Sequence, residues 1–191
     1  MTKLKGILLT QGMHGMISQV EGLAKALDID YVHHTVELNN FWKLFPPKLT
    51  PISQSVFKKI NSKDFDVIIS CGRKSVIPSI YLKKNSSKKV TNIHIQDPKV
   101  NLNNFSYVIA PEHDELDGEN VFSTKGAVHY LSRQEIDDNS DYLKNRLDTN
   151  KEYFSLILGG PTKHYDYSDE NILNILDLFD NLISKNNFQG I

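Results

Sequence analysis

Arg73 and Lys74 stand side by side shortly after the apolar residues 67–69, in a strand expected at residues 66–70. A fully apolar run of this length is typical of a buried parallel strand, and parallel sheets present their chemistry at the carboxyl ends of the strands. Two cations followed by Ser75, at the start of a helical pattern, therefore predict an anion site. The alternative is an ordinary solvated turn, in which lysine and arginine are common.

Two further clusters contain carboxylates and follow the next two apolar runs. Gln96 and Asp97 end the first of these runs, and the proline that follows Asp97 holds the chain extended, so that the carboxylate is directed outward. Glu112, His113 and Asp114 end the second, where a carboxylate can orient a histidine for proton transfer. Turn-forming Asp-Pro pairs and exposed polar loops have similar sequences, so each cluster alone is also consistent with a surface loop.

Two glycine-bearing loops complete the set of candidate sites. They follow the first and the last apolar runs and consist of Gly12, His14 and Gly15, and of Gly159, Gly160, Lys163 and His164. Glycines let backbone amides approach a phosphate closely, and the amides at a helix start accept an anion. Neither loop has the spacing of a dinucleotide fingerprint or of a P-loop. The first loop is equally consistent with a purely structural strand-to-helix turn.

Other chemistries are disfavoured by residue types and spacing. Cys71 is the only cysteine, which excludes an internal disulfide and a cysteine-based zinc site. The histidine and carboxylates of the candidate clusters lack the spacing of a metal site, and no serine or cysteine stands in a nucleophile elbow. We therefore expect neither a metal nor a bound cofactor.

Composition is that of an ordinary globular protein. The chain has 191 residues, of which 39% are hydrophobic and 24% charged, and its net charge is -1 from 22 basic and 23 acidic residues. A neutral chain argues against a broad nucleic-acid or membrane surface. The amino-terminal apolar stretch is too short for a signal peptide, and no apolar run approaches the length of a membrane span. We expect a cytoplasmic protein that binds no nucleic acid and associates with membranes at most peripherally.

Apolar runs alternate with helical patterns along the chain. Strands are expected at residues 5–10, 31–38, 66–70, 90–96, 107–110, 121–123 and 154–158, and helices at residues 16–27, 53–60, 75–84 and 168–185. Ser75 is expected to cap its helix. This alternation predicts an α/β fold, a Rossmann-like parallel sheet with helices on both faces.

The expected domain organisation is asymmetric. Residues 1–150 form the Rossmann-like domain, with a polar stretch at residues 132–150 at its end. Residues 151–191 supply one buried strand and one helix, which cannot cover both faces of a sheet. They are therefore expected to be the start of a second Rossmann-like domain, with the chain a fragment of a longer protein.

Four segments taken together resemble a known family: ISCGRKSVIPSIYLKK, HIQDPKVNLNNFSYVIAPEHDELDGENV, STKGAVH and LILGGPTKHY. They are similar to the bacterial homologues of the plant mitochondrial fission protein named for elongated mitochondria, and the resemblance runs through nearly the whole chain. The family is similar in fold to GT-B glycosyltransferases, in which two Rossmann-like domains face each other across a cleft. The amino-terminal domain of such enzymes takes the acceptor, and the carboxyl-terminal domain takes the nucleotide-sugar.

The resemblance assigns each cluster to one side of that cleft. The first glycine loop (Gly12, His14, Gly15), residues 73–75, residues 96–98 and residues 112–114 would line one side, and Gly159, Gly160, Lys163 and His164 would meet the diphosphate from the other. The leading hypothesis is a glycosyltransferase that uses a nucleotide-sugar donor and a cell-envelope acceptor. In it His113 or Asp114 acts as base, while Lys163 and the neighbouring glycine amides stabilise the departing diphosphate. With an incomplete second domain, this chain alone is expected to be inactive.

Two alternatives remain open. The first is a non-catalytic GT-B scaffold that recruits protein partners for fission or division, with the aromatic segment at residues 41–45 as the contact. Burial of that segment under the sheet is the opposing interpretation. The second is a nucleoside-diphosphate-sugar epimerase using NAD, which the missing dinucleotide fingerprint disfavours.

Overall fold

Parallel strands form the central sheet of the protein in a computed structural model that describes residues 3–61, 64–148, 150–160 and 166–191. Within these residues the chain divides into two compact units, residues 1–131 and residues 132–191. The contacts group residues 132–150 with the second unit, and the domain boundary expected after residue 150 stays a prediction.

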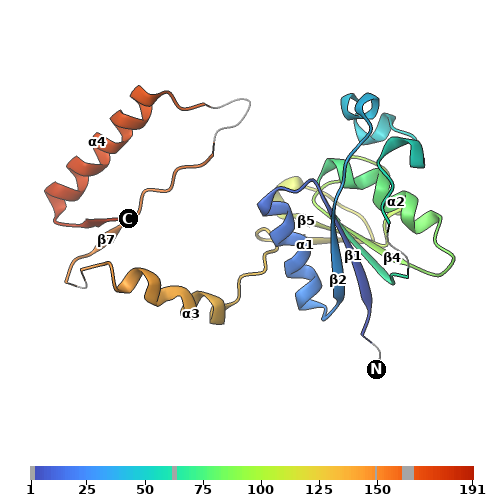
Figure 1. The fold of residues 1–191 in the computed structure, drawn as a ribbon, viewed down its shortest axis with the longest axis horizontal. Coiled ribbons are helices and arrows are strands. Elements are labelled where there is room, and N and C mark those ends of the chain that lie inside the picture. The colour runs from blue at the N-terminus through green and yellow to red at the C-terminus, as the bar shows by residue number, and fades with distance from the viewer. Residues whose placement is uncertain (1–2, 62–63, 149, 161–165) are drawn as a thin grey trace. The chain divides into compact units, whose positions relative to one another are not determined.

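The sheet of the first unit contains six strands among the described residues, all paired in parallel in the order β2-β1-β3-β4-β5-β6 (Figure 1). The strands are β1 (Lys5–Thr10), β2 (Asp30–Thr35), β3 (Val67–Cys71), β4 (Thr91–Ile95), β5 (Tyr107–Pro111) and β6 (Val121–Thr124). β3 is buried at every position, as its uninterrupted apolar run predicts. The α/β class and the Rossmann-like sheet are confirmed.

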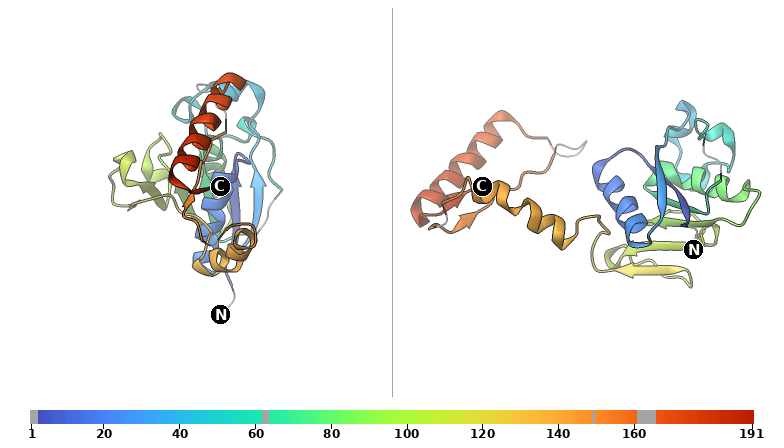
Figure 2. Two further views of the ribbon diagram at one scale, coloured as in Figure 1. Left: turned by 90° about the vertical axis from the view of Figure 1, so that its left-hand side faces the viewer. Right: turned by 60° about the horizontal axis from the view of Figure 1, so that its bottom comes forward.

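Helices cover both faces of this sheet, because alternate residues of each central strand point to opposite sides. On one face, Leu8 and Ile69 pack with Val20 of α1 (His14–Ala26). On the other face, Ile7 and Ile68 pack with the buried side of α2 (Val76–Lys84). The right-hand view of Figure 2 shows α1 (blue) and α2 (green) from a second direction.

Short 3-10 turns replace regular helices in several connections of the first unit. They are η1 (Asn40–Leu44), η2 (Pro47–Leu49), η3 (Gln54–Val56), η4 (Arg73–Ser75), η5 (Leu102–Asn104) and η6 (Glu112–Asp114). The helix expected at residues 53–60 is therefore wrong. Only η3 forms there, and Phe57 pairs with Leu38 in an isolated antiparallel bridge. Phe57 is 2% exposed, so burial in the core decides its conformation against a weak helical pattern.

The second unit is built from two helices and a two-stranded parallel sheet among the described residues. Its elements are α3 (Arg133–Lys144), β7 (Tyr153–Phe154), α4 (Asp169–Asn186) and β8 (Gln189–Gly190). α3 lies within residues 132–150, for which the sequence predicts a polar stretch and no helix. Its start carries a capping box, in which Glu135 N donates to Ser132 Oγ and Ser132 N to Glu135 Oε2.

The buried strand expected at residues 154–158 is also wrong. β7 contains only Tyr153 and Phe154, and Ile157 is 89% exposed. A single neighbour, β8, pairs with β7 in the described part of this unit, and two strands cannot bury a sheet face. The helix expected at residues 168–185 is confirmed as α4, which begins after the capping residue Ser168.

Candidate functional site

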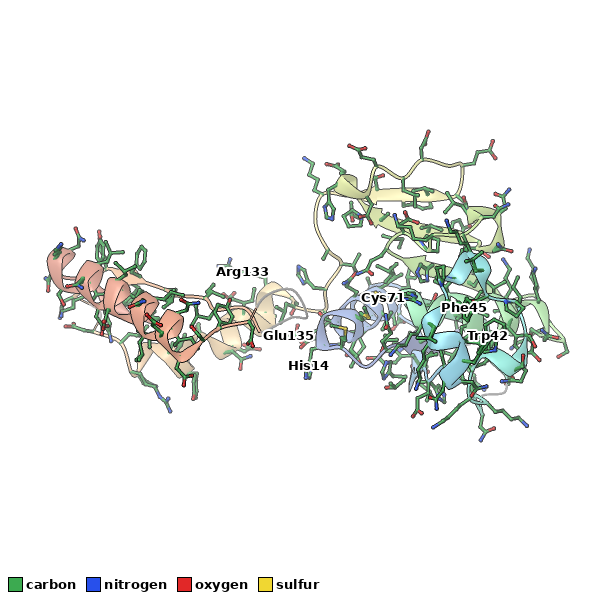
Figure 3. All side chains as sticks on the ribbon, turned by 90° about the horizontal axis from the view of Figure 1, so that it is seen from above. His14, Trp42, Phe45, Cys71, Arg133 and Glu135 are labelled. Carbon is green, nitrogen blue, oxygen red and sulfur yellow. The ribbon has the colours of Figure 1, made fainter. Side chains whose placement is uncertain are left out.

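The candidate residues of the first unit follow four strands that are adjacent in the sheet. The order β1-β3-β4-β5 brings their carboxyl ends to one edge, where open α/β sheets bind ligands. Figure 3 views this edge from above, with His14 at the start of α1, Trp42 in η1 and Phe45 directly after η1. The strand ends therefore place the four predicted clusters along one edge of the sheet.

The ends of β4 and β5 form a shared hollow of about 260 Å³. It is lined by Gln96, Asp97, Lys99, Pro111, His113 and Asp114, which we call the β4–β5 hollow. Two clusters that are separated in the sequence thus meet at one place. A backbone hydrogen bond of 2.8 Å from Gln96 N to Ile109 O joins the two strand ends. Lys99 is a lining residue that the sequence reasoning missed, although its place two residues after Asp97 on a turn was a usable signal.

Asp97 is the most sheltered charged group of the hollow, with 15% of its side chain exposed. Lys99 Nζ lies 2.6 Å from Asp97 Oδ2, and Lys99 N donates to Oδ1 over 2.7 Å. Burial raises the pKa of the Asp97 carboxyl, but the hydrogen bonds and the charge of Lys99 outweigh burial and hold this pKa below its ordinary value. Asp97 is therefore an ionised hydrogen-bond acceptor at neutral pH.

The turn that carries Asp97 has an unusual backbone. Gln96 has φ +80° and Lys99 φ +55°, in the left-handed region that residues with side chains seldom adopt. Conformations of this kind cost on the order of 1–3 kcal/mol and are frequent at ligand-binding sites. The hydrogen bonds of Gln96 N and Lys99 N hold the turn in place, so that Asp97 has a fixed position at the mouth of the hollow.

His94 is a buried residue of β4, three positions before Asp97. Its side chain is 1% exposed, Ser70 Oγ lies 2.9 Å from its Nδ1, and the ring packs 5.1 Å from that of Phe105. Burial lowers the pKa of His94 to about 3, against a smaller opposing effect of the Asp97 charge. His94 is therefore neutral at physiological pH and supports the end of β4 without reaching the solvent.

His113 and Asp114 are on the solvent side of the hollow. The His113 side chain is 79% exposed, and its Nε2 lies 3.8 Å from Asp114 Oδ1, an electrostatic contact that is too long for a hydrogen bond. Glu112 is exposed on the same η6 turn. The three residues predicted for proton transfer thus lie together, with His113 and Asp114 lining the hollow.

The cluster after β3 has a partly structural role. Arg73 Nη2 donates to the backbone oxygens of Phe45 over 2.6 Å and Lys43 over 3.2 Å. Ser75 occupies the residue before α2, but its buried hydroxyl donates to Cys71 O instead of capping the helix, so the expected cap is wrong. Lys74 is partly exposed and has no hydrogen bond or ion pair within the described residues. Lys74 is therefore the cation of this cluster that stays available to an anion.

The turns after β1 and β3 touch each other. Gly72 has φ +87°, and a Cβ at this position would lie 2.6 Å from Gln11 Nε2 and 2.7 Å from Met16 Sδ. Gly12 has φ +86°, and its amide donates to Thr10 Oγ1 over 3.0 Å. The positive φ favours glycine at both positions, and at Gly72 an added Cβ would also have to displace the ends of the Gln11 and Met16 side chains.

The rest of the first glycine loop is open. His14 and Gly15 are exposed in the first turn of α1, and no atom lies within 4 Å of a Cβ added at Gly15. The residue before the helix, Met13, provides no side-chain cap, so the first amides of α1 are free of a capping side chain.

The candidate residues of the second unit are less fully described. Gly159 and Gly160 are exposed, and nothing lies within 4 Å of a Cβ added at either. Lys163 and His164 lie outside the described residues. A cleft between these residues and the carboxyl edge of the first unit stays a prediction.

Among the described residues, no group of three or more His, Cys, Asp or Glu side chains could hold a metal ion. Within the same residues no helix has the length and apolar character needed to cross a membrane. A larger hollow of about 440 Å³ lies on the α1 side of the sheet, but its lining, which includes Leu27, Ile93, Tyr107 and Phe122, is almost wholly apolar.

Fold and site together define the first unit as a Rossmann-like α/β domain with a polar hollow at the carboxyl edge of its sheet. The family model described as Mitochondrial fission ELM1 matches residues 14–190, nearly the entire chain. The chain belongs to the mitochondrial fission ELM1 family, which confirms the resemblance carried by the four sequence segments. No curated protein and no solved structure matches the chain.

Proposed function

We propose that this chain is part of a GT-B-like glycosyltransferase that uses a nucleotide-sugar, and that the β4–β5 hollow receives the acceptor. One observation carries the proposal: the hollow brings an ionised carboxylate, an amide, a cation and a histidine to the carboxyl edge of a Rossmann-like sheet. Such groups bind the hydroxyls of a saccharide, because each hydroxyl both donates and accepts hydrogen bonds.

The proposed chemistry is a direct displacement at the anomeric carbon of the donor sugar. The acceptor oxygen forms a bond to that carbon while the bond from the carbon to the diphosphate oxygen breaks. His113 accepts the acceptor's proton, and Asp114, 3.8 Å away, stabilises the resulting imidazolium. Asp97 positions the acceptor by accepting a hydrogen bond from a second hydroxyl.

The diphosphate is proposed to leave against the second glycine loop. Gly159 and Gly160 offer backbone amides with open space around them, and Lys163 adds a positive charge. Charge-assisted hydrogen bonds of this kind are worth roughly 1.5–3 kcal/mol each. No metal or bound cofactor is needed in this scheme, since the protein supplies the charge. The same proposal includes a cytoplasmic location for the protein and an acceptor from the cell envelope.

The test is calorimetry with UDP- and GDP-sugars on a longer member of the family. We expect binding of at least one of them, and a loss of binding when the lysine matching Lys163 is changed to alanine. Changing the histidine matching His113 to asparagine should leave binding intact and lower sugar transfer by about 10²- to 10⁴-fold. The proposal is abandoned if no nucleotide-sugar produces heat and the lysine variant keeps full activity in cells.

A second candidate function is a non-catalytic scaffold that recruits a protein partner. The observation in its favour is the geometry of His113, which is largely exposed and makes no hydrogen bond to Asp114 in the described structure. Catalytic histidines are usually oriented by such a bond. A scaffold would retain its partner in cells after His113→Asn and Asp97→Asn, whereas an enzyme would lose its activity.

A further inference from the structure

Residues 40–52, between β2 and β3, present apolar side chains to the solvent at the carboxyl edge of the sheet. We call them the 40–52 segment; it contains η1 and η2 and is the cyan part at the upper edge of the first unit (Figure 1). Four of its apolar side chains are exposed: Phe41 by 61%, Leu44 by 82%, Leu49 by 63% and Ile52 by 38%. A cluster of such side chains marks an interaction site, because a single surface leucine is ordinary but a group of them is not.

The backbone of the 40–52 segment is firmly held. The Arg73 guanidinium donates to Phe45 O and Lys43 O, which ties η1 to the turn after β3. The ring of Trp42 contacts the rings of Phe41 and Phe45, with centroids 4.9 and 5.8 Å apart, and packs partly against the core. The tips of Phe41 and Leu44 therefore project from an anchored turn, whereas Trp42 is partly buried against the core. The burial predicted as the opposing interpretation thus holds in part for Trp42 and not for Phe41 and Leu44.

The charged residues of the segment itself are all of one sign. Residues 38–60 contain four lysines and no aspartate or glutamate, although the whole chain has a net charge of -1. Lys58 is paired with Glu37. Lys43 donates to the uncharged Asn40 and lies close enough to Glu37 to lower the pKa of that carboxyl, but forms no ion pair with it among the described residues; Lys48 has no ion pair there either. Two exposed cations thus lie within the segment itself, next to Leu44 and Leu49.

The form of the surface favours a lipid bilayer over a folded protein. Leu44 and Leu49 stand out as separate tips on two short 3-10 turns, with Pro46 and Pro47 between them. A hollow of about 240 Å³ lies beside the segment and is lined by Lys48 and Ile52, but neither Leu44 nor Leu49 lines it. A protein partner that matched such tips would need a pocket for each, whereas the interfacial region of a membrane accepts them in any arrangement. Lysines beside apolar side chains suit anionic headgroups at the same depth.

We propose that the 40–52 segment is a membrane-binding site that inserts Phe41, Leu44 and Leu49 into the interfacial region of an anionic bilayer, with Lys43 and Lys48 on the lipid phosphates. The site is peripheral and independent of the proposed sugar transfer. It would hold the carboxyl edge of the sheet, and with it the β4–β5 hollow, close to a membrane surface.

The test is binding of the full chain to vesicles of phosphatidylcholine containing phosphatidylglycerol, with pure phosphatidylcholine vesicles as the comparison. Trp42 is the only tryptophan and lies within the segment, so its fluorescence reports insertion directly. We expect brominated lipids to quench Trp42 in anionic vesicles, and salt to weaken binding. Lys43→Gln and Lys48→Gln should each lower the partition coefficient about fivefold.

The apolar contribution is tested by Leu44→Ser and Leu49→Ser, which should each lower the partition coefficient on the order of tenfold. Leu27→Ser is the matched control, because Leu27 is 48% exposed on the same unit but lies outside the segment, and it should leave binding unchanged. Urea unfolding of each variant confirms that it is folded. The proposal is overturned if wild-type chain does not bind anionic vesicles, or if the serine variants bind as wild type does. Binding of a protein partner through Leu44 and Leu49 without any vesicle binding would assign the segment to protein recognition instead.

Discussion

His94 is expected to make the first unit less stable at mildly acidic pH. Burial lowers the pKa of this histidine to about 3 in the folded protein, from an ordinary value of 6.5. Below about pH 6.5 the unfolded chain binds a proton at this side chain, whereas the folded chain does not until about pH 3. The stability contributed by the neutral ring is therefore complete above pH 6.5 and is lost progressively as the pH falls toward 3.

The loss of stability depends on how far the pH falls within the range from about 6.5 to about 3. Each pH unit within it costs about 1.4 kcal/mol, so a change from about pH 8 to about pH 5 costs about 2 kcal/mol. Solvent does not weaken this loss of stability, because His94 is 1% exposed. The negative charge of Asp97 favours the protonated ring, but burial outweighs this effect and the pKa of His94 is lowered overall.

The assay is urea unfolding followed by the fluorescence of Trp42, which packs partly against the core of the first unit. His94→Asn is the comparison, since an uncharged amide can replace the ring nitrogen that faces Ser70 but cannot be protonated. Exposed carboxylates with lowered pKa values, such as Asp64, and the partly buried His33 are common to both proteins and cancel. The free energy of unfolding should fall by about 2 kcal/mol more in wild type than in the variant over this pH change. An equal fall in both proteins would refute the assignment of a neutral buried His94.

Three further predictions concern the turn after β3 and the helix that follows it. Ser75→Ala should lower the free energy of unfolding by about 1–2 kcal/mol, because it removes a buried hydroxyl that donates to Cys71 O and Gly72 O. Ser79→Ala removes a buried hydroxyl that has no partner in the described structure, so in the same urea titration it should be neutral or stabilising. Gly72→Ala should lower the free energy of unfolding by about 1–3 kcal/mol, because Gly72 has a positive φ and an added Cβ would meet Met16. At Gly15 an added Cβ meets nothing within 4 Å, so Gly15→Ala should not destabilise the protein. Equal effects at the two glycines would contradict this account. Burial raises the pKa of the Cys71 thiol to about 12, so Ellman's reagent should not label native protein at pH 8 and should label it fully in urea; rapid labelling of native chain would show that β3 opens.

Much of the first unit could be predicted from its sequence. The runs that became β1, β3, β4 and β5 are apolar enough to lie inside a sheet on either face, and the period of residues 16–27 favours only a helix. The family resemblance was also accessible, because it depends on the order of several motifs and not on any one of them. The two errors have different causes. At residues 53–60 the helical pattern is weak, and burial of Phe57 in the core decides the conformation. Residues 154–158 are strongly apolar, but within the described part of the second unit only β8 pairs with β7, and two strands cannot bury such a run.

The candidate site could be predicted from the sequence only in part. Each cluster was recognisable by its place after an apolar run, but the meeting of Asp97 with Asp114 in one hollow depends on the pairing of β4 with β5. The sequence could not show that Arg73 is bound to the carbonyls of Lys43 and Phe45, because those residues lie 28 to 30 positions away. It also gave no sign that Leu44 would be far more exposed than Trp42 in the same turn.

The amino-acid sequence by itself determined the class of fold, the family and the strand ends that carry polar groups, because these depend on hydrophobic periodicity and on short motifs within a few residues. Only the tertiary structure decided which polar groups share a hollow, which cation is occupied by backbone carbonyls and which apolar side chains reach the solvent. Those outcomes are set by contacts between segments far apart in the chain, whose geometry no local pattern of residues encodes.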